Sequence, residues 1–479
     1  MTQTEVQQGH PKGLYTLFFT EMWERFSYYG MRALLVLYLV NKIGFERSDA
    51  LEIYGIFTGL VYLTPLLGGF LADKVLGHRK AIFIGGILMA LGQFALAASP
   101  DFLNLGLGLI IMGNGFFKPN ISTIVGSLYS ENDPRKDSAF TIFYMGINLG
   151  AFLSPLVCGT LGEQVGWSYG FAAAGCGMLL GVIWFHFQGH SLGEAGYPPG
   201  RAEKKLFARD WFEIIAYIIA NAIFVWGALS IWGSLTDEVR TTIMYVLGIG
   251  GLLGLIYIIY TNTSGGDQWS RVWVILILCF FNVYFWAGFE QAGGTFNLFA
   301  DTNTDRVVFG SEIPAAYFQS VNAIMIFALA PVFSTLWIAL GRINKNPNIP
   351  VKFGMALIFI ALGFVVMSMA EGATAGGSVK VSPMWLIMVY LLHTVGELCL
   401  SPIGLSMISK LSPPKITAVM MGVWFGSIAL ANYMAGILET LLHKFDLNLF
   451  TFLVISSAAA GLALLLISPI LKRMMKGIV

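Results

Sequence analysis

Apolar residues are concentrated in long stretches along this chain, and short polar segments separate them. Each stretch has about 20 or more residues, enough for an α-helix to cross the hydrocarbon core of a bilayer. The stretches lie near residues 14–40, 50–76, 80–98, 102–128, 138–162, 166–188, 211–232, 240–260, 272–300, 314–341, 350–370, 382–411, 415–442 and 448–471. The pattern predicts an all-α membrane protein with fourteen transmembrane helices.

The first stretch departs from this apolar pattern on one face. At about 100° per residue, its charged and phenolic side chains fall on a single stripe of the helix. The stripe consists of Glu21, Glu24, Arg25, Tyr28, Tyr29 and Arg32. An unpaired charge at the bilayer centre costs about 2.5–3.5 kcal/mol even on the mildest scale. We therefore expect this face to line a hydrated interior enclosed by protein.

The polar segment Gly189–Asp210 divides the predicted helices into groups of six, two and six. The first and last groups are expected to be two bundles related as repeats. We predict an N-terminal six-helix bundle over residues 1–189, a cytoplasmic linker with two extra helices over 190–269, and a C-terminal six-helix bundle over 270–479. The two extra helices are expected to face lipid.

The positive charges orient the chain. Nineteen of the 28 Lys and Arg residues fall on one side of the predicted topology, six fall on the other, and three lie within the membrane. Because cytoplasmic loops are enriched in Lys and Arg, both termini are predicted to be cytoplasmic.

Composition agrees with a membrane protein and excludes several other classes. The chain is 56% hydrophobic and 11% charged, whereas a soluble domain has about 25% charged residues. Its net charge of +1 argues against a nucleic-acid partner. The 4 cysteines lie in apolar segments, where we expect small core residues. We find no metal-ligand spacing, nucleophile elbow, phosphate loop or cleavable signal peptide, so we expect neither an enzyme nor a bound cofactor or metal.

Three further charges lie deep in apolar stretches: Lys118, Glu290 and Glu397. At about 1.5 Å per residue, Arg32 and Glu290 lie at similar depth toward the outer side, and Lys118 and Glu397 both lie near mid-membrane. These are two pairs of opposite sign, each joining the two bundles. They could simply hold the bundles together, but buried ion pairs stabilise poorly because desolvation offsets the attraction. We favour a functional role.

One carboxylate is in excess within the membrane. The cations are Arg25, Arg32 and Lys118, and the carboxylates are Glu21, Glu24, Glu290 and Glu397. At least one carboxylate is therefore poorly compensated and is a natural proton carrier. The sequence does not say which one, since paired sites titrate jointly. Other polar or aromatic candidates for the lining, each more often a packing residue when taken alone, are Tyr62, Asn148, Trp286, Asn322, Ser401 and Trp424.

Four motifs in order resemble those of the proton-coupled oligopeptide transporters, a family of the major facilitator fold. Glu21–Gly30 resembles the family's ExxERFxYYG signature, and Phe140–Gly150 resembles its second signature. Gly113–Asn120 is similar to its helix 4 motif, and Phe285–Gln291 to its helix 7 motif. The resemblance implies two six-helix bundles, with two additional central helices typical of bacterial members. It implies the bacterial inner membrane as the location.

The resemblance also implies residue roles. The peptide carboxylate would contact Arg25, Tyr29 and Lys118. The peptide amino group would contact Asn148, Asn322 and Glu397. Side-chain pockets would be lined by Tyr28, Tyr62, Trp286, Ser401 and Trp424. Proton coupling would involve Glu21, Glu24, Arg25 and Glu290. Arg32 is counted with the substrate-binding residues, and the gates would be the Arg32–Glu290 and Lys118–Glu397 pairs.

The expected function is import of di- and tripeptides with protons, by a monomer that uses the proton gradient and no cofactor. A dipeptide is a zwitterion about 7 Å long, so separated Lys and Glu side chains match its two ends. Animal members of the family carry a helix 2 histidine implicated in proton handling, which this chain lacks, so coupling must rest on carboxylates. Two alternatives stay open: transport of another anion such as nitrate, or proton/drug antiport.

Overall fold

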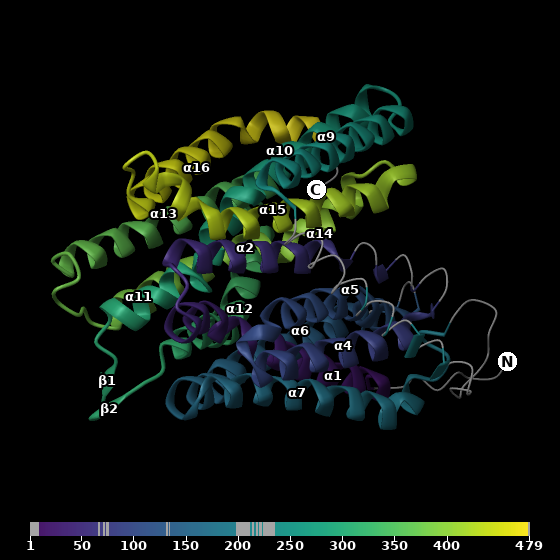
Figure 1. The fold of residues 1–479 in the computed structure, drawn as a ribbon. Helices are drawn as coiled ribbons and strands as arrows, with labels where there is room; N and C mark the ends of the chain where they lie inside the picture. The colour runs from purple at the N-terminus through teal and green to yellow at the C-terminus, as the bar shows by residue number, and fades with distance from the viewer. Residues whose placement is uncertain are drawn as a thin grey trace. The chain divides into compact units, whose positions relative to one another are not determined.

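The structure, a computed structural model, describes residues 9–65, 68–69, 72, 76–130, 133, 135–197 and 235–477, with six isolated positions between 211 and 223. This part contains fourteen α-helices and one two-stranded antiparallel sheet (Figure 1). The chain divides into two compact units. Unit 1 comprises Met1–Gly44, Leu63–Trp226 and Ile313–Ile324; unit 2 comprises Phe45–Tyr62, Gly227–Glu312 and Met325–Val479.

Unit 1 is built from five long helices and the start of a sixth. They are α1 (Lys12–Tyr38), α4 (His78–Ala98), α5 (Leu103–Ser127), α6 (Lys136–Gly159), α7 (Trp167–Gln188) and the first residues of α12 (Gln319–Arg342). Short π or 3₁₀ turns extend or connect them: η1 (Leu39–Ile43), η3 (Pro100–Phe102), η4 (Thr160–Val165), η5 (Gly189–Leu192) and η7 (Ala315–Phe318). Helix α1 packs against α6 and α7, and α4 packs against α5 and α7.

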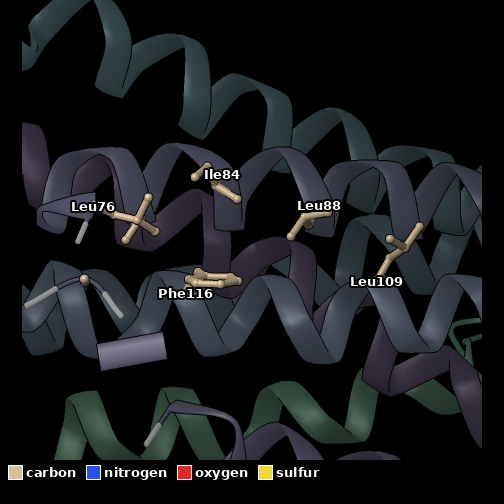
Figure 2. Packing of buried hydrophobic residues seen from close by; sticks show 7 residues of the cluster. Leu76, Ile84, Leu88, Leu109 and Phe116 are labelled. Carbon is tan, nitrogen blue, oxygen red and sulfur yellow. The ribbon is translucent and has the colours of Figure 1, made fainter. Parts of the chain in front are cut away.

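Glycines bring α4 and α5 into backbone contact. A Cβ added to Gly113 would lie 2.6 Å from the carbonyl oxygen of Gly85, so neither position has room for a side chain. Beside this contact lies an apolar cluster, in which Phe116 and Leu109 of α5 face Ile84 and Leu88 of α4 (Figure 2). The close approach fixes the rotation of α5 about its own axis. It thereby determines which polar residues of α5 face α1.

Unit 2 contains the remaining helices. They are α2 (Arg47–Leu63), α9 (Asp237–Asn262), α10 (Gly266–Phe289), α11 (Thr295–Asn303), most of α12, α13 (Ile349–Ala373), α14 (Met384–Leu411), α15 (Thr417–His443) and α16 (Leu449–Met474), with the turns η6 (Glu290–Ala292) and η8 (Pro414–Ile416). Helix α13 packs against α14 and α16, and α10 packs against α15. A hairpin of β1 (Val307–Val308) and β2 (Ser311–Glu312) connects α11 to α12.

The predicted span over residues 272–300 is present within Gly266–Asn303, but it is not one regular helix. Helix α10 ends at Phe289, a 3₁₀ turn follows, and α11 begins only at Thr295. The break contains Gly293 and Gly294, which stabilise a helix poorly. Gln291 holds the turn, since its amide donates to the carbonyls of Ala287 at 3.3 Å and Ala435 at 3.0 Å. Glu290 therefore lies in a helix break rather than within a regular helix.

Most predicted helices have a counterpart in the described residues. The helix predicted over 211–232 lies outside them apart from isolated positions, and the predicted 50–76 helix is described as α2 only to Leu63. Eight helices are long and apolar enough to cross a membrane by length and composition alone, among the described residues. Helix α1 is not one of the eight, because the charged residues of its stripe make its composition too polar.

The predicted domain boundaries stay a prediction. The compact units are divided differently, since α2 belongs to unit 2 and residues 313–324 belong to unit 1.

The expectation that all four cysteines are core residues is wrong for Cys176, which is exposed, while Cys158, Cys279 and Cys399 are buried and free. Cys176 lies on α7 near Leu179 and Leu180, which are exposed too; an apolar stretch alone does not distinguish this face from a core-facing one.

Candidate functional site

The charged stripe of α1 is buried inside unit 1. Glu21, Glu24 and Arg25 are 2%, 0% and 2% exposed. The Arg25 guanidinium donates to both Glu24 oxygens, through Nη2 to Oε1 at 2.7 Å and through Nε to Oε2. The same Nε lies 3.2 Å from Oε1 of Glu21. One guanidinium thus serves two carboxylates, and the pairing is unequal because Glu24 has the bidentate contact.

Helix α5 completes the surroundings of these carboxylates. Asn114, fully buried, donates from Nδ2 to Oε1 of Glu24 at 3.3 Å. Lys118, one turn further along α5, interacts electrostatically with Glu21. The second oxygen of Glu21, Oε2, is buried and has no hydrogen-bond partner among the described residues. The cluster of Glu21, Glu24, Arg25, Asn114 and Lys118, here called the α1–α5 charge cluster, therefore has one carboxylate oxygen without a donor.

Aromatic rings flank the guanidiniums of α1. The Arg25 guanidinium carbon lies 5.3 Å from the ring centroid of Tyr28 and 5.8 Å from that of Tyr29. The Arg32 guanidinium carbon lies 5.6 Å from the Tyr29 ring centroid. Cation–π contacts of this kind strengthen as water is excluded. The helical stripe predicted from the sequence is thus present, and its members contact one another.

Asn148 and Asn322 also belong to unit 1. Asn148 on α6 is 6% exposed and donates to the carbonyl of Tyr144 at 3.0 Å. The flanking Gly150 lies against α1, where an added Cβ would come within 2.9 Å of Cβ of Arg25. The absence of a side chain at Gly150 therefore allows α6 to approach α1 closely beside Asn148. Asn322 lies on α12 and is half-buried.

The other predicted site residues lie in unit 2. Glu290 is 3% exposed and Glu397 on α14 is 8% exposed. Tyr62, near the end of α2, is half-buried, as is Trp286 on α10, whose indole nitrogen has no partner among the described residues. Ser401 lies on α14. The partners of the predicted Arg32–Glu290 and Lys118–Glu397 pairs fall in different compact units, so both pairings stay predictions.

The indole ring of Trp424 on α15 is contacted on two sides, and its backbone carbonyl accepts a hydrogen bond. Its ring lies 6.2 Å from that of Phe353, and an added Cβ on Gly404 of α14 would collide with the indole. Its carbonyl accepts from Ser427 Oγ at 2.7 Å, and Ser427 in turn accepts from Asn282 Nδ2 at 2.9 Å. A Trp fixed in this way is a rigid apolar surface.

Several buried amides were not singled out from the sequence, and two of them, Asn114 and Gln93, contact α1. Asn114 falls within the quoted Gly113–Asn120 motif, so its position was available, but nothing in the sequence shows that it faces Glu24. Gln93 on α4, also fully buried, donates to the carbonyl of Ser27 at 3.2 Å and to its Oγ at 3.3 Å. Gln93 thus links α4 to α1 through the backbone carbonyl and the hydroxyl of Ser27, and not through a charged group.

Comparison with known proteins places the chain in a family. A family model described as the POT family matches residues 79–455. The chain belongs to the POT family. The peptide transporter YePEPT of Yersinia enterocolitica is 39% identical over 453 residues, which are 90% of this chain and 88% of that protein. A di-/tripeptide transporter of Lactococcus lactis is 34% identical over 487 residues, which are 97% of each chain.

Solved structures agree with this assignment. The crystal structure of a POT peptide transporter in complex with sulfate matches with a TM-score of 0.85 and 39% sequence identity, covering 98% of this chain and 97% of that one. The predicted family and the predicted major facilitator fold are confirmed, and the chain is an integral membrane transporter.

Proposed function

We propose that this POT family member imports di- and tripeptides together with protons, by alternating access between its N- and C-terminal helix bundles. The observation that carries the proposal is the buried α1–α5 charge cluster, with its one carboxylate oxygen lacking a donor. Relatives named as peptide and di-/tripeptide transporters support the choice of substrate. The protein is a transporter without enzymatic activity, needs no cofactor, draws its energy from the proton gradient and works as a monomer.

The charge cluster suggests how proton and peptide are coupled. Glu21 takes the proton, because its Oε2 has no donor to stabilise a negative charge. Protonation changes the cluster from neutral to singly positive, since Glu24 remains to balance only one of Arg25 and Lys118. The excess positive charge then binds the peptide carboxylate. Proton binding thus favours peptide binding, which is the requirement for symport.

The remaining predicted residues complete the site. Arg25, Tyr29 and Lys118 hold the peptide carboxylate. Asn148, Asn322 and Glu397 hold its amino group, and weakly discriminating aromatic and amide side chains accept varied peptide side chains. The Arg32–Glu290 and Lys118–Glu397 pairs act as gates. The protein lies in the inner membrane of a bacterium with both termini in the cytoplasm, in line with the distribution of Lys and Arg.

Uptake by purified protein in liposomes tests this function. With an inward acid gradient, labelled dialanine should accumulate against its own gradient, and a protonophore should abolish the accumulation. Unlabelled di- and tripeptides should compete, whereas single amino acids and nitrate should not. Competition by nitrate would instead support anion transport, and expulsion of a drug against the gradient would support antiport.

A further inference from the structure

Asn114 is a buried amide in which only the nitrogen, and not the oxygen, makes a hydrogen bond to the described residues. Its Nδ2 donates to Glu24, while its Oδ1 has no partner among the described residues. Burying an acceptor without a partner is unfavourable, so a leucine would serve packing alone better than this asparagine. The role of the Asn114 amide is therefore its hydrogen bond to the Glu24 carboxylate.

That hydrogen bond favours the ionised form of Glu24. Oε1 of Glu24 accepts from both Asn114 and Arg25, and Oε2 accepts from Arg25. Hydrogen bonds to a charged acceptor are roughly twice as strong as those between neutral groups. If Glu24 were protonated and the amide turned over to accept from it, the new bond would be the weaker neutral kind. Asn114 therefore opposes protonation of Glu24, while nothing comparable stabilises Oε2 of Glu21.

We propose that Asn114 is a positioning residue for proton coupling: it keeps Glu24 ionised against Arg25, so that the transported proton goes to Glu21. This inference rests on the proposed function and deepens it, because it assigns the proton to one carboxyl group of the charge cluster. If Glu24 also took up a proton, Arg25 would lose its bidentate partner. The number of protons bound per peptide would then vary with pH.

Two substitutions remove the donor in different ways. Asn114→Leu keeps the branching and the number of side-chain heavy atoms and removes both polar ends. Asn114→Ser is too short to reach Glu24 while leaving a small polar side chain. In both variants, the pH of half-maximal proton-driven dialanine uptake should rise by about one unit, the size expected for a lost hydrogen bond to a charged group. Exchange of labelled for unlabelled peptide without a gradient should persist.

Gln93→Leu is the matched control, since Gln93 is an equally buried amide that donates to α1 without contacting a carboxylate. It should lower thermal stability about as much as Asn114→Leu and leave the pH profile unchanged. An unchanged profile in both Asn114 variants, or an equal shift in Gln93→Leu, would overturn the proposal.

An infrared pH titration of the carboxyl C=O absorption measures the same protonation without any peptide. In the Asn114 variants, a second carboxyl group should protonate within the working pH range, and the added substitution Glu24→Gln should remove its band. This measurement separates failure of the Asn114 proposal from failure of the proposed peptide transport. The absence of a second band would count against Asn114 even if transport were confirmed.

Discussion

At the scale of single residues, the sequence shows which charges share a face but not how they are paired. The spacing of Glu21, Glu24 and Arg25 on one helix is enough to predict a buried charged stripe. The unequal pairing depends on the Arg25 rotamer and on Asn114, which comes from α5 at a rotation fixed by helix packing. The excess of one carboxylate could therefore be counted from the sequence, whereas the hydrogen-bond partners of Glu21 and Glu24 could not be read from it.

Lys118 is the first residue to test. In Lys118→Ala, peptide binding should weaken by at least about tenfold, because a charged hydrogen bond to the peptide carboxylate, about 1.5–3 kcal/mol, is lost. Calorimetric titration with a dipeptide measures this directly. Lys136→Ala, at the start of α6, removes the same charge outside the cluster and should bind normally. Normal affinity in Lys118→Ala would rule out its role at the carboxylate.

Glu290 tests the coupling of the second unit to the proton gradient. In Glu290→Gln, proton-driven accumulation of dipeptide should be lost, because the neutral amide cannot gain or release a proton, while peptide counterflow should remain measurable. Liposome uptake with and without a pH gradient separates the two activities. Uphill uptake at the wild-type level would show that Glu290 takes no part in coupling.

At the scale of helices, the apolar pattern predicts where helices lie and misses where one is interrupted. Most residues over 272–300 are apolar, so hydropathy alone favours one helix. Gly293, Gly294 and the hydrogen bonds of Gln291 produce the break instead. The contacts of α2 could not be predicted from the sequence either. Its Gly55 lies in backbone contact with Gly436 of α15, a long-range pairing that no local pattern encodes.

The α2–α15 contact also carries an ion pair, Arg47 with Glu439, whose Nε–Oε1 distance is 2.6 Å. The pair joins segments that the sequence assigns to different bundles, so we expect it to break and reform during transport. Because both side chains are partly exposed, the pair contributes about 0.2–1 kcal/mol. Charge reversal is therefore more informative than removal.

Arg47→Glu and Glu439→Arg should each slow dipeptide uptake several-fold, since each places like charges together. The double variant should recover most of the rate by restoring an ion pair in the opposite sense. Initial uptake rates of the four proteins form a double-mutant cycle. Additive losses in the double variant would show that the pair has no part in the transport cycle.

At the scale of the whole molecule, the fold class and family could be read from the sequence, because helix length, charge asymmetry and four motifs all agree. The grouping of segments into compact units could not. Residues 313–324 join unit 1 through specific contacts, such as the Glu163 carboxylate, which accepts the backbone N–H groups of Ala315 and Ala316 at 2.7 and 2.9 Å. Such contacts depend on one conformation of the chain, whereas the hydrophobic pattern is the same in every conformation.

The pH dependence of uptake is a property of the whole molecule. It could arise from polar groups in the loops as well as from the α1–α5 charge cluster. Near the start of α6, the Arg135 side chain and backbone donate to Asp133 and lower the pKa of that carboxyl to about 2. A lowered pKa means that its stabilisation is present above the ordinary value and is lost only as pH falls through about 2. Asp133 therefore stays ionised throughout the working range of a proton symporter.

His10 is the other surface candidate, since its Nδ1 lies 2.9 Å from the Tyr129 hydroxyl and its Nε2 lies 3.2 Å from Oγ of Ser138. His10→Gln and Asp133→Asn remove these two surface groups one at a time. Because we propose that carboxyl groups within the membrane take the proton, both variants should keep the wild-type pH profile of dialanine uptake. Glu21→Gln should flatten that profile. A profile altered in His10→Gln and unchanged in Glu21→Gln would contradict the proposal that a carboxyl group within the membrane takes the proton.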